Sequence, residues 1–364
     1  MRTNTLVNVA FIGCGRISKK HYEAIIGMSE SGVHLTAVAD LEVEKCAPYV
    51  TETAIKVTND FMLDGFLDGS DLAVILTESG NHYKHAKFAL EAGLDVLIEK
   101  PVTLKLEDAI ELRAIANRFD RKIYVVKQNR FNGPIVTARK FIESGFLGNP
   151  QISSVQVRWC RPQEYYDLAA WRGTWAMDGG VISNQASHHI DLMRWFMGPL
   201  KTVQALERRF GVDIETEDTV LALIEFESGA VGTLEATTST RPRNLEGSFS
   251  IQGSLGAFEV GGFAVNEMRY IESRINDFTS TENTSNNEVA HDTSDVYGSG
   301  HAAIYREIVK DRLGQENSAV TIDDAIETLK VIHVLYRSIE SGKKIVVNGD
   351  DIRSFRMGQI NALK

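Results

Sequence analysis

A glycine-rich turn directly after an apolar run restricts the fold of this chain more than any other feature. Residues Val7–Ile12 are largely apolar, and the run Gly13-Cys14-Gly15-Arg16-Ile17-Ser18 follows them. This G-x-G-x-x-S pattern is one small residue away from the G-x-G-x-x-G/A fingerprint of strand–turn–helix units that bind dinucleotides. Gly13 allows the tight turn, and Gly15 lets the backbone approach a pyrophosphate at the helix N-terminus. The alternative is an ordinary glycine-rich turn in an α/β protein.

A second apolar run, Leu35–Ala39, ends at an acidic residue, Asp40. The spacing of roughly 20 residues from the glycines is where a ribose 2′-hydroxyl needs an acceptor. Leu41 follows Asp40, in place of the arginine that a 2′-phosphate would favour, so the pattern predicts NAD rather than NADP. The residues expected to begin the cofactor site are Gly13, Gly15, Arg16, Ile17 and Asp40.

Apolar runs and helical patterns alternate as far as about Gln128. The predicted strands are Val7–Ile12, Leu35–Ala39, Leu72–Leu76, Asp95–Ile98 and Ile123–Val126, and the predicted helices are Ile17–Ser29, Asn81–Ala92 and Leu106–Phe119. This alternation predicts a doubly wound parallel sheet, a Rossmann dinucleotide-binding domain over residues 1–128. Ligands of such sheets bind beyond the carboxyl ends of the strands, where Asp40, Thr77 and Glu99 lie.

Strand-like runs dominate the rest of the chain. They are Ile152–Trp159, Thr202–Arg209, Thr219–Phe226, Val231–Thr238, Ser248–Gln252, Ala257–Val260 and Asn266–Glu272. Predicted helices cover Ile135–Ser144, Ile182–Met197, His301–Leu313 and Ile322–Ser341, and the polar segment Thr279–Asp295 is expected to be a loop. The pattern predicts an α+β domain over residues 129–364, built on a largely antiparallel open sheet.

Composition excludes several classes of function. A chain of 364 residues is long enough for two domains, and its net charge of −10 argues against nucleic acid or an anionic membrane as the main partner. Three widely spaced cysteines and no apparent signal peptide or membrane span favour the reducing cytoplasm. His82 and His85 lack an evident carboxylate partner, so we expect no metal site.

The run Glu99-Lys100-Pro101 follows a strand that ends at the predicted ligand edge. The Lys100–Pro101 bond can be cis, and Lys100 would then project toward the nicotinamide. A lysine that is partly desolvated in a cleft can have a lowered pKa and take part in proton transfer. The alternative is a surface lysine in a strand-to-helix loop.

A second group of candidate residues lies in the run from Gly179 to Asp191. If this run is helical, Asn184, His188 and Asp191 share one face, and His189 points about 100° away from His188. An imidazole and an amide on one face suit recognition of sugar hydroxyls and proton transfer. The alternative is a buried histidine that internal hydrogen bonds satisfy.

Together these elements resemble the glucose–fructose oxidoreductase/inositol dehydrogenase (Gfo/Idh/MocA) family of NAD(P)-dependent sugar oxidoreductases, over nearly the whole chain. The resemblance implies that Lys100 and His188 flank the reacting hydroxyl, and that open sheets pack face to face in dimers or tetramers. Asn184 stands where the family usually has Asp, which puts a proton relay through a carboxylate there in doubt. We expect Thr77, His82, Glu99, Lys100 and Gln128 to complete the cofactor site.

A narrower resemblance is to the WlbA-type UDP-N-acetylglucosaminuronate 3-dehydrogenase branch. The runs that carry it are Val125–Arg130, Arg161–Tyr166, Trp171–Trp175, Asn184–His188, Glu215–Thr219, Asn244–Ser248 and Tyr297–His301. That branch has Asn at the position of Asn184. The resemblance implies oxidation of the 3-hydroxyl of a UDP-sugar acid to a 3-keto sugar, in the biosynthesis of bacterial surface polysaccharide (O-antigen). Another sugar or inositol dehydrogenase, or an NAD-binding regulator without turnover, remains an alternative.

Such a substrate carries two phosphates and a carboxylate, which arginine forks and lysines suit. Tyrosines and tryptophans can stack on a sugar or on uracil. The candidate substrate-binding residues are Lys100, Lys127, Arg130, Arg161, Tyr165, Tyr166, Trp171, Arg172, Asn184 and His188. We expect Lys100 or His188 to be the base and Asn184 to orient the sugar.

Overall fold

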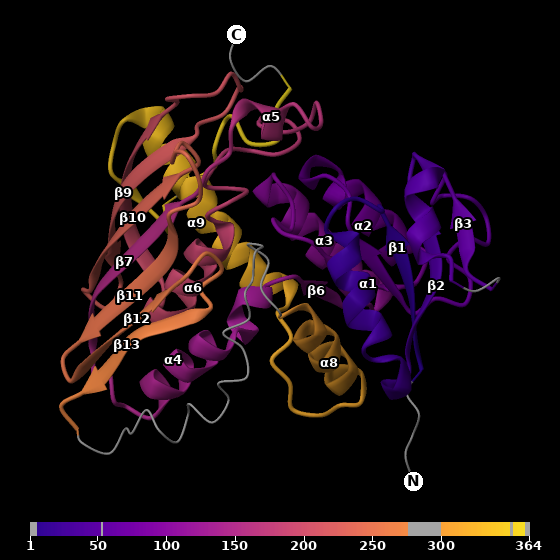
Figure 1. The fold of residues 1–364 in the computed structure, drawn as a ribbon, viewed down its shortest axis with the longest axis horizontal. Helices are drawn as coiled ribbons and strands as arrows, with labels where there is room; N and C mark the ends of the chain where they lie inside the picture. The colour runs from indigo at the N-terminus through magenta and orange to yellow at the C-terminus, as the bar shows by residue number, and fades with distance from the viewer. Residues whose placement is uncertain (1–5, 52–53, 276–299, 350–351, 361–364) are drawn as a thin grey trace. The chain divides into compact units, whose positions relative to one another are not determined.

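The structure, a computed structural model, describes residues 6–51, 54–275, 300–349 and 352–360. The chain forms two compact units, each made of two separate stretches (Figure 1). The first unit holds Met1–Val126 and His301–Glu327, and the second holds Lys127–Gly300 and Thr328–Lys364. The expected division after residue 128 lies two residues from the break at Val126, whereas residues 301–327 pack with the first unit. The predicted loop Thr279–Asp295 and residues 297–299 lie outside the described residues.

The first unit is built on a six-stranded sheet in the order β3-β2-β1-β4-β5-β6, in which every neighbouring pair is parallel. The strands are β1 Val7–Ile12, β2 Val33–Ala39, β3 Lys56–Thr58, β4 Leu72–Ile75, β5 Asp95–Ile98 and β6 Ile123–Val125. The inner strands are buried on both faces, which their continuous apolar runs indicate. The predicted Rossmann sheet is therefore confirmed. β3 was not predicted, because it is three residues long and mostly exposed.

Among its described residues, the first unit holds the helices α1 Ser18–Ile26, α2 His82–Glu91, α3 Leu106–Phe119 and α8 His301–Arg312, and α9 (Ile322–Ser341) begins in it. α8 comes from near the end of the chain and packs against α1. Arg312 Nη1 lies 2.5 Å from Asp95 Oδ2, and Val125 N donates to Val320 O at 2.9 Å. These contacts explain why residues 301–327 belong to the dinucleotide-binding unit.

The second unit is built on an eight-stranded sheet in the order β13-β12-β11-β7-β10-β9-β8-β14. Its strands are β7 Pro150–Arg158, β8 Leu200–Arg208, β9 Thr219–Phe226, β10 Val231–Thr237, β11 Glu246–Gly253, β12 Gly256–Gly261, β13 Glu267–Ser273 and β14 Ile345–Val346. Neighbouring strands are antiparallel except β7 and β10, which are parallel. This confirms the largely antiparallel sheet.

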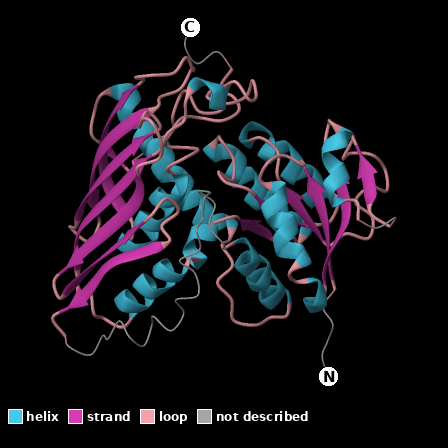
Figure 2. Cartoon of the chain, viewed as in Figure 1, coloured by secondary structure: helices cyan, strands magenta, loops and turns pink. Residues whose placement is uncertain are grey.

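Helices cover one face of this sheet (Figure 2). They are α4 Gly133–Glu143, α6 Ser187–Met197 and α9 Ile322–Ser341, while the short α5 Gln163–Tyr166 follows β7. The core beneath them is aromatic: the ring centroid of Phe196 lies 5.2 Å from that of Phe249 and 5.8 Å from that of Phe258. Within the described residues, no helix is both long and apolar enough to cross a membrane.

The predicted helix Ile182–Met197 is wrong at its start, because α6 begins at Ser187. Contacts to Glu217, in the segment before β9, hold the preceding turn out of helical geometry. Val181 N donates to Glu217 O at 3.3 Å, and Ile182 N donates to Glu217 Oε1 at 3.2 Å. Asn184 therefore precedes the helix, and it does not share a helical face with His188.

Candidate active site

The glycine-rich turn connects β1 to α1 in a conformation that requires glycine at its first position. Gly13 has a φ of +100°, and a Cβ there would lie 2.8 Å from the carbonyl carbon of Leu76. A Cβ at Gly15 would meet nothing within 4 Å among the described residues. Arg16 is exposed and Ile17 half-buried at the start of α1. The turn thus offers open backbone at a helix N-terminus, as a pyrophosphate needs.

Ser18 accounts for the departure from the usual third glycine of the fingerprint. Its hydroxyl is buried, donates to Gly15 O and lies 2.7 Å from the Tyr49 hydroxyl. The serine therefore keeps the close packing of α1 and closes the turn with a hydrogen bond. A Gly at this position would leave that carbonyl without this donor.

Asp40 stands at the carboxyl end of β2, where the sequence pattern predicts a ribose acceptor. Its Oδ2 accepts from Cys14 N at 2.8 Å, and its Oδ1 accepts from Glu42 N at 3.0 Å. A carboxylate oxygen has two lone pairs, so each oxygen can accept a further hydrogen bond. The carboxylate thus fixes the glycine-rich turn and still has capacity for a ribose hydroxyl.

His82 is buried and joins the segments that follow two neighbouring strands. Its Nδ1 lies 2.7 Å from Pro101 O, and its Nε2 lies 3.0 Å from Thr77 O. Burial lowers the pKa of His82 below its ordinary value. The Thr77 hydroxyl lies 2.9 Å from Nδ1 of His85. The imidazole of His82 therefore contacts protein carbonyls at both of its nitrogens.

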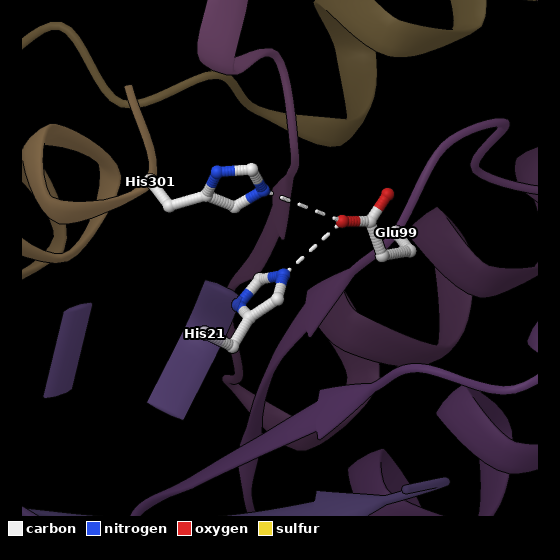
Figure 3. Close-up of side chains that lie close together, drawn as sticks. All are labelled: His21, Glu99 and His301. Atoms are coloured by element: carbon white, nitrogen blue, oxygen red, sulfur yellow. Dashed lines mark hydrogen bonds and ion pairs between the residues drawn. The ribbon is translucent and has the colours of Figure 1, made fainter. Parts of the chain in front are cut away.

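Glu99 is buried, and its contacts were not predicted (Figure 3). Oε1 lies 3.1 Å from His21 Nε2 and 3.9 Å from His301 Nε2, while Oε2 accepts from Lys100 N at 2.9 Å. The Lys100–Pro101 bond is cis, and the Lys100 side chain is half-buried. A histidine on α1 gave no sequence signal of this role, because the helical spacing around His21 resembles an ordinary apolar face.

In the second unit, His188 lies in the first turn of α6 and is mostly buried. The Gln128 amide nitrogen lies 3.1 Å from His188 Nε2, and as a donor it makes Nε2 the acceptor. Gln128, expected at the cofactor, thus contacts the candidate catalytic histidine directly.

Asp191, one turn after His188, is the centre of a buried ion cluster. Its carboxylate is bidentate with Arg130, at 2.7 Å from both Nε and Nη2, and it lies 3.4 Å from Lys127 Nζ. Thr328 Oγ1 donates to it at 2.8 Å. Burial alone would raise the pKa of Asp191, but Arg130 and Lys127 outweigh burial and hold it far below its ordinary value. Two of the predicted substrate-binding cations therefore have an internal carboxylate.

Asn184 is held by a carboxylate that also fixes the chain before it. Its Nδ2 donates to Asp178 Oδ1 at 2.5 Å, and Asp178 Oδ2 accepts from Gly173 N at 2.8 Å. The amide oxygen of Asn184 is thereby oriented without a charge on the side chain. This arrangement suits an amide better than a second carboxylate, because two carboxylates at this distance repel each other.

Arginines and aromatic rings alternate along the segment that contains α5. The Arg161 guanidinium lies 5.2 Å from the Trp159 ring centroid and 5.3 Å from that of Tyr165. The Arg172 guanidinium lies 4.5 Å from the centroids of both Tyr165 and Trp171. We call these five residues the arginine–aromatic ladder.

The two ladder arginines differ from Lys127 and Arg130 in their partners. Arg161 donates to neutral acceptors, Cys160 O at 2.7 Å and Asn244 Oδ1 at 3.1 Å, and Arg172 donates to the Tyr165 hydroxyl at 2.7 Å. Within the described part of the chain, neither guanidinium has a carboxylate at ion-pair distance, and the buried Nε–H of Arg172 meets no acceptor. Tyr166 is buried, with its hydroxyl 3.0 Å from that of Thr238.

Glu217 and Tyr336 hold the turn before α6 and were not assigned from the sequence. Tyr336 OH donates to Glu217 Oε1 at 2.9 Å and accepts from Gly180 N at 3.1 Å. A Cβ at Gly180 would overlap the Glu217 carboxyl group. Burial, and then the nearby charge of Glu207, raise the pKa of Glu217 to about 8. The run Glu215–Thr219 was the only sequence signal, and it came from resemblance alone.

Both halves of the chain match one family. Residues 7–127 match the oxidoreductase family, NAD-binding Rossmann fold, and residues 139–347 match the oxidoreductase family, C-terminal alpha/beta domain. The predicted resemblance is thus confirmed, and the match in the second half alone covers more than half of the chain.

Two solved structures are similar over nearly the whole chain. One is the WlbA dehydrogenase from Bordetella pertussis in complex with NADH and UDP-GlcNAcA, with a TM-score of 0.87 and 33% identity, covering 95% of this chain and 99% of that one. The other is the WlbA dehydrogenase from Chromobacterium violaceum with the same two ligands, with a TM-score of 0.85 and 31% identity, covering 94% and 96%.

A curated relative matches over a shorter stretch. The 1-carboxy-3-chloro-3,4-dihydroxycyclohexa-1,5-diene dehydrogenase of Comamonas testosteroni is 34% identical over 154 residues, and this match spans 41% of the chain and 37% of that protein. Both WlbA structures hold a dinucleotide, NADH. This chain has the features that such a cofactor needs: the glycine-rich turn, the acidic residue after β2 and the parallel sheet. The chain belongs to the Gfo/Idh/MocA oxidoreductase family and is an NAD-dependent oxidoreductase.

Proposed function

We propose that this oxidoreductase converts the 3-hydroxyl of UDP-N-acetylglucosaminuronate, or a close UDP-sugar acid, to the 3-keto sugar. The observation that carries the proposal is the arginine–aromatic ladder, in which Arg161 and Arg172 have no internal carboxylate within the described residues. A guanidinium fork matches a carboxylate or a phosphate, and the neighbouring rings suit a sugar or a base. The two WlbA structures bound to UDP-GlcNAcA support the same substrate class.

In this proposal the residues of the two units have different roles in binding and catalysis. NAD, when bound at the glycine turn of the first unit, supplies the hydride acceptor. Lys100 and His188 act on the 3-hydroxyl, one as the base that takes its proton and the other as its hydrogen-bond partner. Asn184 orients the sugar through its amide, and Arg161 with Arg172 binds the sugar carboxylate. Lys127 and Arg130 act on the site indirectly, because they fix Asp191 on the helix that carries His188.

Substrate charge is the property that tests the proposal. The chain is incubated with NAD and with UDP-GlcNAcA, UDP-GlcNAc or free sugars, and the absorbance of the reduced cofactor is followed. A cation left without its anion is costly, so we expect kcat/KM to favour the acid over UDP-GlcNAc by about 10²-fold or more. Equal kcat/KM for the two, or turnover of free sugars alone, would contradict the proposal.

Matched arginine variants then locate the carboxylate. Arg172→Met and Arg161→Met should raise KM for UDP-GlcNAcA and leave KM for UDP-GlcNAc nearly unchanged. The control is Arg158→Met, because Arg158 already pairs with Glu235 at 2.6 Å on the same sheet. If the control shifts KM as much as the ladder variants do, the ladder is not the acid-binding element.

We also propose that the second unit forms a dimer or tetramer through the sheet face that the helices leave open. Leu206 on β8 pairs with Leu221 on β9, and both side chains are more than half exposed, as is that of Leu223. Exposed apolar area of this kind marks a protein interface. Leu221→Glu should reduce the assembly to monomers in analytical ultracentrifugation, and an unchanged sedimentation profile would contradict the proposal.

The cellular setting is a further part of the proposal. The three cysteines are free, which is in keeping with the reducing cytoplasm. A 3-keto UDP-sugar acid is a substrate for an aminotransferase, and the proposed pathway is surface polysaccharide (O-antigen) biosynthesis. Deletion of the gene should remove the amino-sugar acid from that polysaccharide, which compositional analysis measures.

A further inference from the structure

The buried carboxylate of Glu99 joins two histidines that come from distant parts of the first unit (Figure 3). His21 lies on α1 and His301 begins α8, and both are almost fully buried. Their rings contact each other edge to face, with centroids 5.0 Å apart. The hydroxyl of Tyr305, one turn along α8, lies 2.8 Å from His21 Nδ1. A network of four side chains, Tyr305–His21–Glu99–His301, is thus assembled behind one strand end.

The protonation of His21 follows from its two neighbours. A carboxylate only accepts hydrogen bonds, so the nitrogen at 3.1 Å from Glu99 Oε1 carries the hydrogen. Nδ1 of the neutral ring is then an acceptor, and the Tyr305 hydroxyl donates to it. Burial lowers the pKa of His21, which keeps the ring in this neutral form.

The second oxygen of Glu99 connects this network to Lys100. Oε2 accepts from the backbone N–H of Lys100 at 2.9 Å, while the Glu99 N–H donates to Ile75 O at 3.1 Å in the neighbouring strand. On the far side of Lys100, the carbonyl of Pro101 contacts His82 Nδ1 at 2.7 Å. The backbone on both sides of Lys100 is therefore tied to buried groups.

A metal ion is the alternative reading of the same residues. The three donor atoms lie within 4.8 Å of one another, and two histidines with a glutamate are a donor set that zinc uses. However, a ligating nitrogen must have a free lone pair, and the Nε2 of His21 carries the hydrogen that Glu99 accepts. Nε2 of His21 cannot both donate to Glu99 and ligate a metal, so a measurement of bound zinc separates the network from a metal centre.

We propose that His21, held by the Tyr305 hydroxyl, is a positioning residue that fixes Lys100 through the Glu99 carboxylate, with His301 packed against it. This inference rests on the proposed function, in which Lys100 acts on the sugar hydroxyl. Residues that hold a catalytic group in place typically change rates by about 10- to 100-fold when they are lost, and misplacement by about 1 Å has a similar cost.

The test compares two variants of His21. His21→Leu removes the donor to Glu99, and we expect kcat to fall about 10- to 100-fold, with KM and NAD affinity within about threefold of wild type. His21→Gln returns an amide N–H near the position of Nε2, so kcat should recover to within about threefold. We also expect His21→Leu to shift the pH dependence of kcat, because Lys100 loses its fixed environment.

A pair of tyrosine variants separates positioning from loss of any buried hydrogen bond. Tyr305→Phe removes the donor to His21, whereas Tyr124→Phe removes a bond of 2.6 Å to Asp311 in the same unit. Tyr305→Phe should lower kcat and shift its pH profile, and Tyr124→Phe should change neither. Thermal unfolding of each variant establishes that the chain is folded.

A readout without turnover keeps this inference distinct from the proposed function. The rate at which acetic anhydride acylates Lys100 is measured by mass spectrometry against pH, in the protein without sugar. The profile should shift in His21→Leu and return to that of wild type in His21→Gln. A folded His21→Leu variant with a wild-type profile would overturn the inference. Lack of turnover on every UDP-sugar would refute the proposed function alone.

A measurement of bound zinc tests the alternative metal site. One zinc per chain that resists dialysis, and that is lost in the His301→Ala variant, would overturn the inference in favour of a metal site.

Discussion

The guanidinium of Arg130 and the carboxylate of Asp191 form a buried bidentate ion pair, with both N–O distances 2.7 Å. Asp191 lies three residues after His188 on the same helix, so the pair fixes the turn that carries the candidate catalytic histidine. Arg130 thus has an internal carboxylate on the Nε and Nη2 edge of its guanidinium. Loss of Arg130 should therefore change the stability of the folded chain more than its affinity for substrate.

Arg130→Met should lower the free energy of unfolding by about 3 kcal/mol, because it leaves a buried carboxylate without its bidentate partner. Arg139→Met is the matched control, since Arg139 also stacks on Trp195 but pairs with Glu143 at the surface. Its loss should be below about 1 kcal/mol. Urea unfolding measures the free energy of unfolding of both variants. Equal decreases in the two variants would show that the buried ion pair stabilises the chain no more than the surface pair does.

Asp40 should set the choice between NAD and NADP. Its carboxylate would repel a 2′-phosphate, so we expect NAD to bind at least about tenfold more tightly, as like charges in contact cost several kcal/mol. Asp40→Asn removes the charge but keeps an oxygen that can accept from Cys14 N. Asp40→Asn should therefore reduce the difference between the affinities for NAD and NADP, and the hydrogen bond from Cys14 N should still hold the glycine-rich turn. Calorimetric titration decides, and tighter NADP binding by the wild type would refute the prediction.

Lys100→Ala and His188→Ala should each lower kcat by at least about 10²-fold with little change in NAD affinity, as expected of acid–base groups. The double variant should lose much less than the product of the two effects, because residues that act as a unit are not additive. Steady-state kinetics with saturating NAD provide the test. Near wild-type turnover in Lys100→Ala would remove Lys100 from the mechanism.

Asn184→Ala should raise KM more than it lowers kcat, because an amide orients the sugar but cannot take up a proton. Asn184→Asp sets a second carboxylate against Asp178, which lies 2.5 Å from the present amide nitrogen. We expect that variant to raise KM most at high pH, where both carboxylates are charged. Identical, unchanged KM values for the two variants across pH would contradict this role.

Glu217 predicts a pH dependence of stability. Its pKa is raised from 4.5 to about 8 in the folded state, by burial and by Glu207, with Tyr336 as its hydrogen-bond donor. Between these values the folded chain holds a proton that the unfolded chain has lost. Stability should therefore fall as pH rises from about 4.5 to about 8, by up to about 1.4 kcal/mol per pH unit. Glu217→Gln should remove this slope in urea unfolding, and the same slope in both proteins would refute the assignment.

The sheets were predictable because their patterns are local. β9 alternates buried and exposed residues with a period of two, and its predicted bounds, Thr219–Phe226, are those of the structure. The inner strands of the first sheet are equally plain as continuous apolar runs. The start of α6 was not predictable, because it depends on the Glu217 carboxyl group, 35 residues away from Ile182.

Long-range contacts also hid part of the candidate site. His21 and Tyr305 meet across 284 residues of sequence, and no local pattern relates them. A charged residue carries no sign of its partner in the sequence, so the contacts of Lys127 and Arg130 with Asp191 were not predictable. Only the fold shows that Asp191 takes them up, while Arg161 and Arg172 stack on aromatic rings and bond to neutral oxygens.

The return of His301–Glu327 to the first unit has a practical consequence for anyone who divides the gene. A fragment that stops at Val126 would lack α8, so His21 would lose Tyr305, Asp95 would lose Arg312 and Glu99 would lose His301. The complementary fragment would contain α8, whose apolar face would be exposed to solvent because α1 is missing. To obtain the dinucleotide-binding unit on its own, one would splice Val126 to His301 through a linker and end the polypeptide after Glu327.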